Sequence, residues 1–139
     1  MKICIVVANY YPKISKDLIL GAESVLKNNG IKNYKKILTT GIFEIPVIIS
    51  KNIDSYDGFI ALGCVIKGKT PHFNFISEAT INSIMNLSVT NKKPIGNGII
   101  TCLNKKQAIE RSDLNKKNKG GEAAKALLSV LKILKNDTQ

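Results

Sequence analysis

The sequence predicts an α/β protein, built as one domain in which a four-stranded parallel sheet lies between two layers of helices. Four short apolar runs rich in β-branched residues alternate with segments whose apolar residues recur at helical spacing. The strand-like runs are almost continuously apolar, as expected of strands covered by helices on both faces. A chain of 139 residues that is 44% apolar has room for one such domain, over residues 1–139.

Local signals bound each predicted element. The first helix is expected to stop at Gly30, and the second tolerates Pro46 only in its first turn. The third helix has Thr70 as its N-cap and Pro71 as its first residue. Strands are expected over residues 2–8, 36–39, 56–65 and 95–101, and helices over residues 15–29, 43–53, 70–87, 105–111 and 121–134.

The ligand site of such a sheet is expected beyond the carboxyl ends of its strands. Four segments occupy this position in the predicted strands, namely residues 9–11, 40–44, 64–72 and 96–98. We therefore expect these four segments to converge in space.

The strong positive charge, +11 at neutral pH, does not by itself indicate nucleic-acid binding. Lysines are spread from Lys2 to Lys135 without interleaved aromatic residues, whereas nucleic-acid-binding surfaces combine clustered cations with stacking rings. The one arginine, Arg111, carries the side chain that holds a phosphate in bidentate fashion. Arg111 is a candidate phosphate contact, with a surface ion pair as the alternative.

The cysteines favour neither a disulfide framework nor a metal site. Cys4, Cys64 and Cys102 have apolar neighbours and lack zinc-ligand spacing, and the chain has one histidine. No apolar stretch approaches the roughly 18 residues of a membrane span, and no signal-peptide cleavage site follows the strand-like N-terminus. We expect a cytoplasmic protein with no membrane partner.

Residues 63–70 match the G-x-x-x-x-G-K-[ST] pattern of phosphate-binding P-loops and lie between a predicted strand and a predicted helix. A nucleotide hydrolase or kinase is therefore a rival interpretation. The β-branched pair Val65 and Ile66 stiffens the interior of the stretch, and no other strand ends in an Asp for magnesium. The pattern alone does not decide the function.

The same stretch can bind phosphate simply as the N-terminus of a helix. The backbone N–H groups of residues 68–70 precede the predicted third helix and attract any anion. His72, the only histidine, lies two residues further on. A lone histidine is more often structural, but an imidazole beside a phosphate-attracting loop favours proton-transfer chemistry.

Three sequence blocks carry a resemblance to a known family. They are Gly41 followed by FEIP at residues 43–46, LGCVIKGKTPHF at residues 62–73, and QAIER at residues 107–111 followed by NKG at residues 118–120. Together they resemble the lumazine synthase family, which catalyses the penultimate step of riboflavin biosynthesis, and the resemblance runs from about Ile3 to Leu134. The resemblance implies a single-domain three-layer αβα sandwich with flavodoxin-like strand order. It also implies that the match to the P-loop pattern is accidental.

The resemblance implies a reaction and the residues that hold its phosphate. The family condenses 5-amino-6-(D-ribitylamino)uracil with 3,4-dihydroxy-2-butanone 4-phosphate to 6,7-dimethyl-8-ribityllumazine, phosphate and water, without metal or organic cofactor. By resemblance, His72 transfers protons, Lys69 and Thr70 belong to the phosphate loop, and Arg111 and Lys119 supply its cations.

For the pyrimidine, the resemblance implies that the ring stacks on Tyr10 and that Glu44 accepts hydroxyl hydrogen bonds. A solvated carboxylate is the alternative for Glu44. The other positions that match segments around the ribityl chain and ring edge are Ile42, Phe43, Cys64, Val65, Ile66 and Asn97. The side chains of Val65 and Ile66 are expected to pack in the core, so that their main chain does the binding.

Four residues depart from the commonest family pattern: Tyr10, Thr40, Ile42 and Asn97. Ring recognition is therefore less firmly predicted than phosphate recognition. A descendant that only binds riboflavin or lumazine, and a nucleic-acid-binding module, are the other functional interpretations.

The resemblance also implies self-association. In the family, the segments equivalent to Asn97, Arg111 and Lys119 come from the neighbouring subunit, so a separated monomer should be inactive. The expected assembly is a homopentamer, with a 60-subunit shell as the alternative, and small molecules are the expected substrates.

Overall fold

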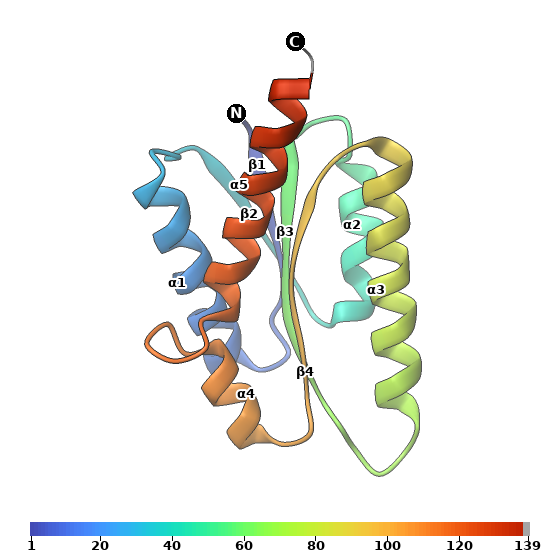
Figure 1. Ribbon diagram of the computed structural model, residues 1–139. Coiled ribbons are helices and arrows are strands. Elements are labelled where there is room, and N and C mark those ends of the chain that lie inside the picture. Colours follow the sequence, from blue (N-terminus) through green and yellow to red (C-terminus); the bar gives the residue numbers. More distant parts are fainter. Residues whose placement is uncertain (138–139) are drawn as a thin grey trace.

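The computed structural model describes residues 1–137 and contains a four-stranded sheet in which all neighbouring strands are parallel. The strands are β1 Ile3–Ala8, β2 Tyr34–Thr39, β3 Gly58–Ile66 and β4 Ile95–Cys102. They lie in the order β2-β1-β3-β4 across the sheet (Figure 1). The predicted three-layer fold and its flavodoxin-like strand order are confirmed.

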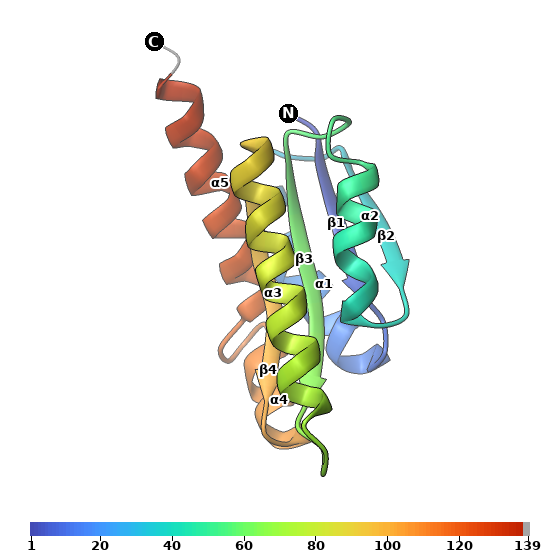
Figure 2. The same cartoon turned by 90° about the vertical axis from the view of Figure 1, so that its right-hand side faces the viewer.

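Helices cover both faces of this sheet. They are α1 Pro12–Asn28, the 3-10 turn η1 Ile42–Glu44, α2 Ile45–Lys51, α3 His72–Asn91, α4 Lys105–Ser112 and α5 Lys119–Asp137. As Figures 1 and 2 show, α1, α4 and α5 form one layer, and α2 and α3 form the other. Within residues 1–137, no helix combines the length and the apolar character that crossing a membrane would require.

Apolar residues of the central strands are buried on both sides of the sheet. Along β1, Ile3, Ile5 and Val7 pack with residues of α1 and α5, whereas Cys4 and Val6 pack with residues of α2. Successive side chains of a strand point to opposite faces. This burial on both faces explains why the strand reads as a continuous apolar run.

Several predicted boundaries shift by a few residues. The first helix begins at Pro12 instead of residue 15, and the second strand begins at Tyr34, which pairs with Ile3 at the start of the ladder. The helix expected over residues 43–53 is a 3-10 turn followed by an α-helix that ends at Lys51.

Two other helices also begin elsewhere than predicted. The third helix begins at His72 with Pro71 as its N-cap and no side-chain cap, so the expectation of Thr70 as N-cap and Pro71 as first residue is wrong. The Thr70 hydroxyl, one residue before the N-cap, accepts the His72 N–H at 3.4 Å. The last helix begins at Lys119 because Asn118 acts as its N-cap and accepts the N–H of Gly121 at 3.1 Å.

Two glycines allow α5 to lie directly against its neighbours. A Cβ at Gly96 of β4 would come within 2.2 Å of the carbonyl oxygen of Ala123 in α5. A Cβ at Gly120 of α5 would come within 2.0 Å of the carbonyl oxygen of Leu18 in α1. No side chain fits at such separations, so α5 is locked against both β4 and α1.

We predict that Gly120→Ala lowers the free energy of unfolding by about 2–3 kcal/mol, because the added methyl group collides with a backbone that cannot move alone. Urea unfolding followed by circular dichroism measures this change. The matched control is Gly68→Ala, since nothing lies within 4 Å of a Cβ built at Gly68. Equal stability of Gly120→Ala and the unaltered protein would contradict the packing described for α5.

Candidate active site

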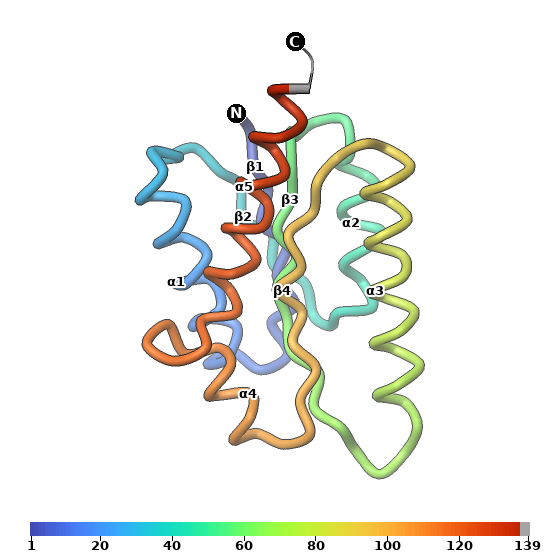
Figure 3. Tube along the Cα trace, viewed as in Figure 1, coloured from blue at the N-terminus to red at the C-terminus, as the bar shows by residue number. Residues whose placement is uncertain are grey.

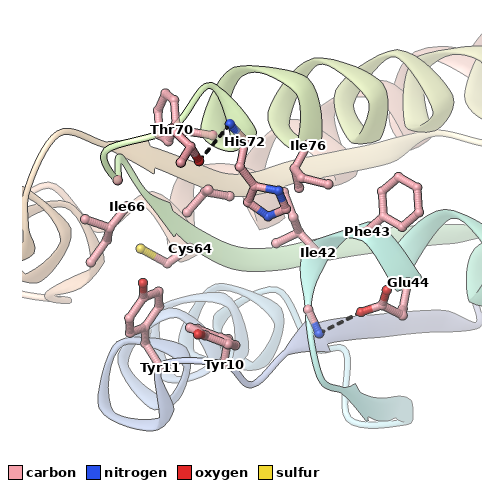
Figure 4. Close-up of a pocket in the computed structure, with 14 residues that line it drawn as sticks. Tyr10, Tyr11, Ile42, Phe43, Glu44, Cys64, Ile66, Thr70, His72 and Ile76 are labelled. Atoms are coloured by element: carbon pink, nitrogen blue, oxygen red, sulfur yellow. Dashed lines mark hydrogen bonds between the residues drawn. The ribbon is translucent and has the colours of Figure 1, made fainter.

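The loops that follow β1, β2 and β3 lie at the carboxyl edge of the sheet (Figure 3). They border a cavity of about 480 Å³ (Figure 4). We call it the histidine cavity. Its lining residues are Tyr10, Tyr11, Gly41, Ile42, Phe43, Glu44, Cys64, Val65, Ile66, Gly68, Thr70, His72, Phe73 and Ile76. Three of the four segments expected to converge therefore do so.

One wall of the histidine cavity is strand β3 where it extends past β1. β1 pairs with β3 only as far as Val7 and Leu62, whereas β3 pairs with β4 as far as Ile66 and Cys102. Residues 63–66 thus have no strand partner on the β1 side. Cys64, Val65 and Ile66 line the cavity, so their backbone groups that face this side are available to a ligand there.

Two tyrosines form another part of the wall. Tyr10 is 70% exposed, and its ring meets that of Tyr11 edge-on with the centroids 4.9 Å apart. Burial raises the pKa of Tyr11, and the nearby Cys64 and Tyr10 add to the rise, so the phenol stays neutral. Sequence reasoning gave Tyr10 a role and placed Tyr11 in the same expected segment, residues 9–11, without assigning it one.

Glu44 is held by the turn in which it lies. Its Oε1 accepts the N–H of Gly41 at 3.0 Å and the hydroxyl of Thr40 at 3.3 Å, as a cap of η1 (Figure 4). These contacts restrict the half-buried carboxylate and leave Oε2 without a hydrogen bond within residues 1–137. Beside it, Ile42 is buried, and Phe43 is 57% exposed.

His72 is the first residue of α3, and its side chain is exposed at the cavity (Figure 4). Thr70 precedes it and also lines the cavity, whereas the exposed Lys69 lies in the same loop but is not among the residues that line this cavity. Phe73 and Ile76 are further lining residues that sequence reasoning missed. Ile76 stands one helical turn after His72, which is the signal that could have identified it.

Residues 63–70, which match the P-loop pattern, do not fold as a P-loop. Gly63 is buried inside β3, where it pairs with Ile99, and the strand continues to Ile66. A P-loop needs a curved backbone over this stretch, but residues 63–66 are extended and their ladder with β4 is intact. Only the short loop of residues 67–71 separates the strand from α3.

The remaining predicted residues lie in a second cavity, of about 340 Å³, which we call the arginine cavity. It is lined by Asn97, Gly98, Ile99, Ile100, Thr101, Arg111, Lys119, Glu122, Ala123 and Ala126. Nζ of Lys119 pairs with the Glu122 carboxylate at 2.9 Å, and Oδ1 of Asn97 accepts the N–H of Ile99 at 3.0 Å. The two cavities share no lining residue.

The expectation that residues 96–98 join the other three segments is therefore wrong. β4 continues to Cys102, and Gly96 and Gly98 pair with Ile60 and Leu62 in the middle of the sheet. Gly96 is required where the backbone of α5 approaches β4, and Gly98 where the Leu62 side chain and Ala123 lie close.

The three thiols are free and buried, as the sequence predicts. Burial raises the pKa of Cys64 to about 12, with a contribution from Cys102, and raises that of Cys4 to about 11 against the opposing charge of Lys35. Within residues 1–137, no three His, Cys, Asp or Glu side chains cluster as a metal site would require.

A parallel sheet with a histidine, a carboxylate and aromatic rings around a cavity at its carboxyl edge defines an α/β enzyme that acts on small polar molecules. Comparison with known proteins narrows this class. Residues 1–135 match the family described as 6,7-dimethyl-8-ribityllumazine synthase.

Relatives that carry the same name agree with this match. The chain is 43% identical to the protein of Bartonella tribocorum (96% of this chain, 89% of the relative) and 42% identical to that of Bartonella bacilliformis (94% and 88%). It is 41% identical to the protein of Buchnera aphidicola subsp. Acyrthosiphon pisum (96% and 86%). The chain belongs to the 6,7-dimethyl-8-ribityllumazine synthase family, transferases of riboflavin biosynthesis.

We predict that Cys64 resists alkylation although it lines the histidine cavity. A pKa of about 12 keeps its thiol protonated at pH 8, and the thiolate is the reactive form. Iodoacetamide should modify Cys64 on the order of a hundredfold more slowly in the native protein than in urea, as followed by peptide mass spectrometry. Equal rates in the two states would show that the thiol is neither shielded nor held neutral.

Proposed function

We propose that the chain condenses 5-amino-6-(D-ribitylamino)uracil with 3,4-dihydroxy-2-butanone 4-phosphate, and that each site is assembled from the histidine cavity of one copy and the arginine cavity of the next. The observation that carries this proposal is the separation of the imidazole from the cations. His72 and Arg111 line different cavities of the same chain.

The histidine cavity has no cation of its own among its lining residues. A phosphate dianion that arrives there meets the N-terminus of α3 and the hydroxyl of Thr70, whereas the exposed Lys67 and Lys69 of the same loop are not among the lining residues. Lys119 and the guanidinium of Arg111 line the other cavity. A second copy that places its arginine cavity beside this loop supplies the missing charge.

In this arrangement the pyrimidine lies on the exposed ring of Tyr10, against Ile42 and Phe43. Oε2 of Glu44 accepts a hydroxyl of the ribityl chain, because Oε1 is occupied by the η1 cap. The free backbone edge at Cys64, Val65 and Ile66 pairs with polar atoms of the ring, and Asn97 of the neighbouring copy completes the enclosure. The roles given to Cys64, Val65, Ile66 and Asn97 are supported by the family resemblance and by the position of these residues in the lining of the two cavities.

The chemistry needs orientation, proton transfer and a held phosphate. An amine of the pyrimidine attacks the ketone to form an imine with loss of water, phosphate is eliminated, and the second amine closes the ring onto the remaining carbonyl with loss of a second water. His72 stands beside the phosphate loop and can both accept and return protons near neutral pH. Lys69, Thr70 and the neighbouring copy's Arg111 and Lys119 stabilise the negative charge of the departing phosphate.

The assembly proposed for this function is a closed homopentamer, and a cytoplasmic location is part of the same proposal. Exposed apolar side chains on α3 and α5 provide surface for contacts between copies, among them Phe75, Met85, Val89, Val130 and Ile133. Sizing of the native particle distinguishes a pentamer from a larger shell.

We predict that the purified protein forms the lumazine product from the two substrates without ATP or added metal, as followed by its absorbance. Arg111→Ala should raise the KM for the phosphorylated ketone about tenfold or more and leave the KM for the pyrimidine nearly unchanged, because the phosphate loses a charged partner. Arg111→Lys keeps the charge without the bidentate fork. Its KM for the phosphorylated ketone should therefore lie between those of the unaltered protein and Arg111→Ala. An unaltered KM for the ketone would remove Arg111 from this role.

A subunit-mixing experiment tests the shared site. His72→Ala should slow turnover about tenfold or more. In an assembly made only of His72→Ala chains, or only of Arg111→Ala chains, every site has a defect. When Arg111→Ala and His72→Ala chains are unfolded and refolded together, about a quarter of the contacts join an intact histidine cavity to an intact arginine cavity. Activity should therefore recover toward about a quarter of the native value.

The control is each variant refolded alone under the same conditions. If the mixture never exceeds the average of the two variants although the chains exchange, the site lies within a single copy.

A further inference from the structure

The hydroxyl of Tyr11 is a polar group of the histidine cavity to which the proposed function gives no role. Tyr11 directly precedes α1 and lines the cavity, and its partly buried ring packs against the same core cluster as Ile66. Within residues 1–137 its hydroxyl makes no hydrogen bond, whereas the hydroxyl of Tyr34 donates to Glu23. A tyrosine whose polar end meets a cavity and no protein partner can use that end to bind a ligand.

Figure 4 shows which part of the cavity this hydroxyl faces. The Tyr11 side chain points toward Cys64 and Ile66, and Glu44 lies at the other end of the cavity. Cys64 and Ile66 belong to the stretch of β3 that has no strand partner on the β1 side. The loop of residues 67–71 follows this stretch directly. Tyr11 therefore faces the part of the cavity that leads to the phosphate loop.

The two substrates of the proposed reaction divide the cavity between them. The pyrimidine and its ribityl chain use Tyr10 and Glu44, whereas the phosphate of the ketone meets Thr70 at the N-terminus of α3. The carbon chain of the ketone joins its phosphate to the amine of the pyrimidine, so it lies between these two ends, beside the free edge of β3. The hydroxyl of Tyr11 faces that edge. The carbonyl and hydroxyl oxygens of the carbon chain are therefore the groups that it meets.

We propose that Tyr11 is a further substrate-binding residue, whose hydroxyl donates a hydrogen bond to an oxygen of the carbon chain of the phosphorylated ketone. The inference rests on the proposed function for the identity of that substrate. A tyrosine suits this position because a side chain with only two rotatable bonds loses little entropy when a ligand binds. The edge-on contact with the Tyr10 ring restricts it further.

The hydroxyl is suited to donate a hydrogen bond and not to act as a base. Burial raises the pKa of Tyr11, and the nearby Cys64 and Tyr10 add to the rise, so the phenol keeps its proton at neutral pH. A neutral donor holds a carbonyl or hydroxyl oxygen without adding a charge to the cavity. Proton transfer during the reaction stays with His72.

Packing alone is the other interpretation of Tyr11. Its ring meets the exposed ring of Tyr10 edge-on, with the centroids 4.9 Å apart, and so supports the surface on which the pyrimidine is proposed to lie. A phenylalanine would give the same support. Removal of the hydroxyl alone therefore separates the two interpretations.

The test is Tyr11→Phe, which keeps the ring. It should raise the KM for the phosphorylated ketone about fivefold, as expected for the loss of one hydrogen bond between neutral groups, with the KM for the pyrimidine and the inhibition constant of inorganic phosphate unchanged. The matched control is Tyr56→Phe, because Tyr56 is also partly buried and meets the ring of Phe59 edge-on. Tyr56 lies just before β3 begins, at the end of the strand away from the cavity, so all three constants should keep their native values.

A second readout does not depend on turnover. The chain has four tyrosines, and in an isotope-labelled sample the Cζ signal of each phenol responds to hydrogen bonding of its hydroxyl. The signal that is missing from Tyr11→Phe belongs to Tyr11. Addition of the phosphorylated ketone without the pyrimidine should shift this signal and leave that of Tyr56 in place, and inorganic phosphate should shift neither.

Three kinetic outcomes for Tyr11→Phe would overturn the proposal. They are a native KM for the ketone, an equal rise of both KM values, and a rise of the phosphate inhibition constant in proportion to the KM for the ketone. An unshifted Tyr11 signal, at a ketone concentration that protects the native protein against thermal unfolding, would overturn it as well. If the unaltered protein forms no lumazine, the proposed function fails, and the Tyr11 signal still shows whether the ketone binds at this hydroxyl.

Discussion

The unequal length of neighbouring strands is the constraint on which the site depends. β1 stops at Ala8, and the hydroxyl of the buried Ser15 donates to the Ala8 carbonyl at 2.9 Å, so a side chain of α1 satisfies the last acceptor of the strand. β3 continues beyond that point, supported by its full ladder with β4. The space left where β1 ends is the histidine cavity. Its polar edge is backbone that would otherwise be paired within the sheet.

The layered fold and the position of its ligand site could be predicted from the sequence, because both follow from patterns within single elements. Continuous apolar runs such as residues 3–8 indicate strands covered on both faces, and the rule for parallel sheets then nominates their carboxyl ends. Tyr10, Glu44 and His72 line the cavity that this rule predicts. The family resemblance added roles that the folding pattern does not contain.

Features that depend on contacts between elements could not be predicted in this way. Residues 96–98 are expected at the carboxyl edge of the sheet, but β4 continues to Cys102. Gly96 is required because the backbone of α5 passes close to β4, and no local pattern reveals that approach. Residues 63–70 matched a nucleotide motif, but pairing with β4 keeps the first half of the match extended. In both places, contact with a segment distant in sequence determines a conformation that the local sequence does not specify.

The placement of two unlike half-sites on one chain constrains the symmetry of any assembly that completes them. A contact between different surfaces of identical molecules is head-to-tail, and it ends either in a ring or in an open filament. An open row leaves one half-site empty at each end, whereas a ring leaves none. In the proposed assembly, closure therefore gives every copy a full complement of catalytic groups, and each chain takes part in two sites.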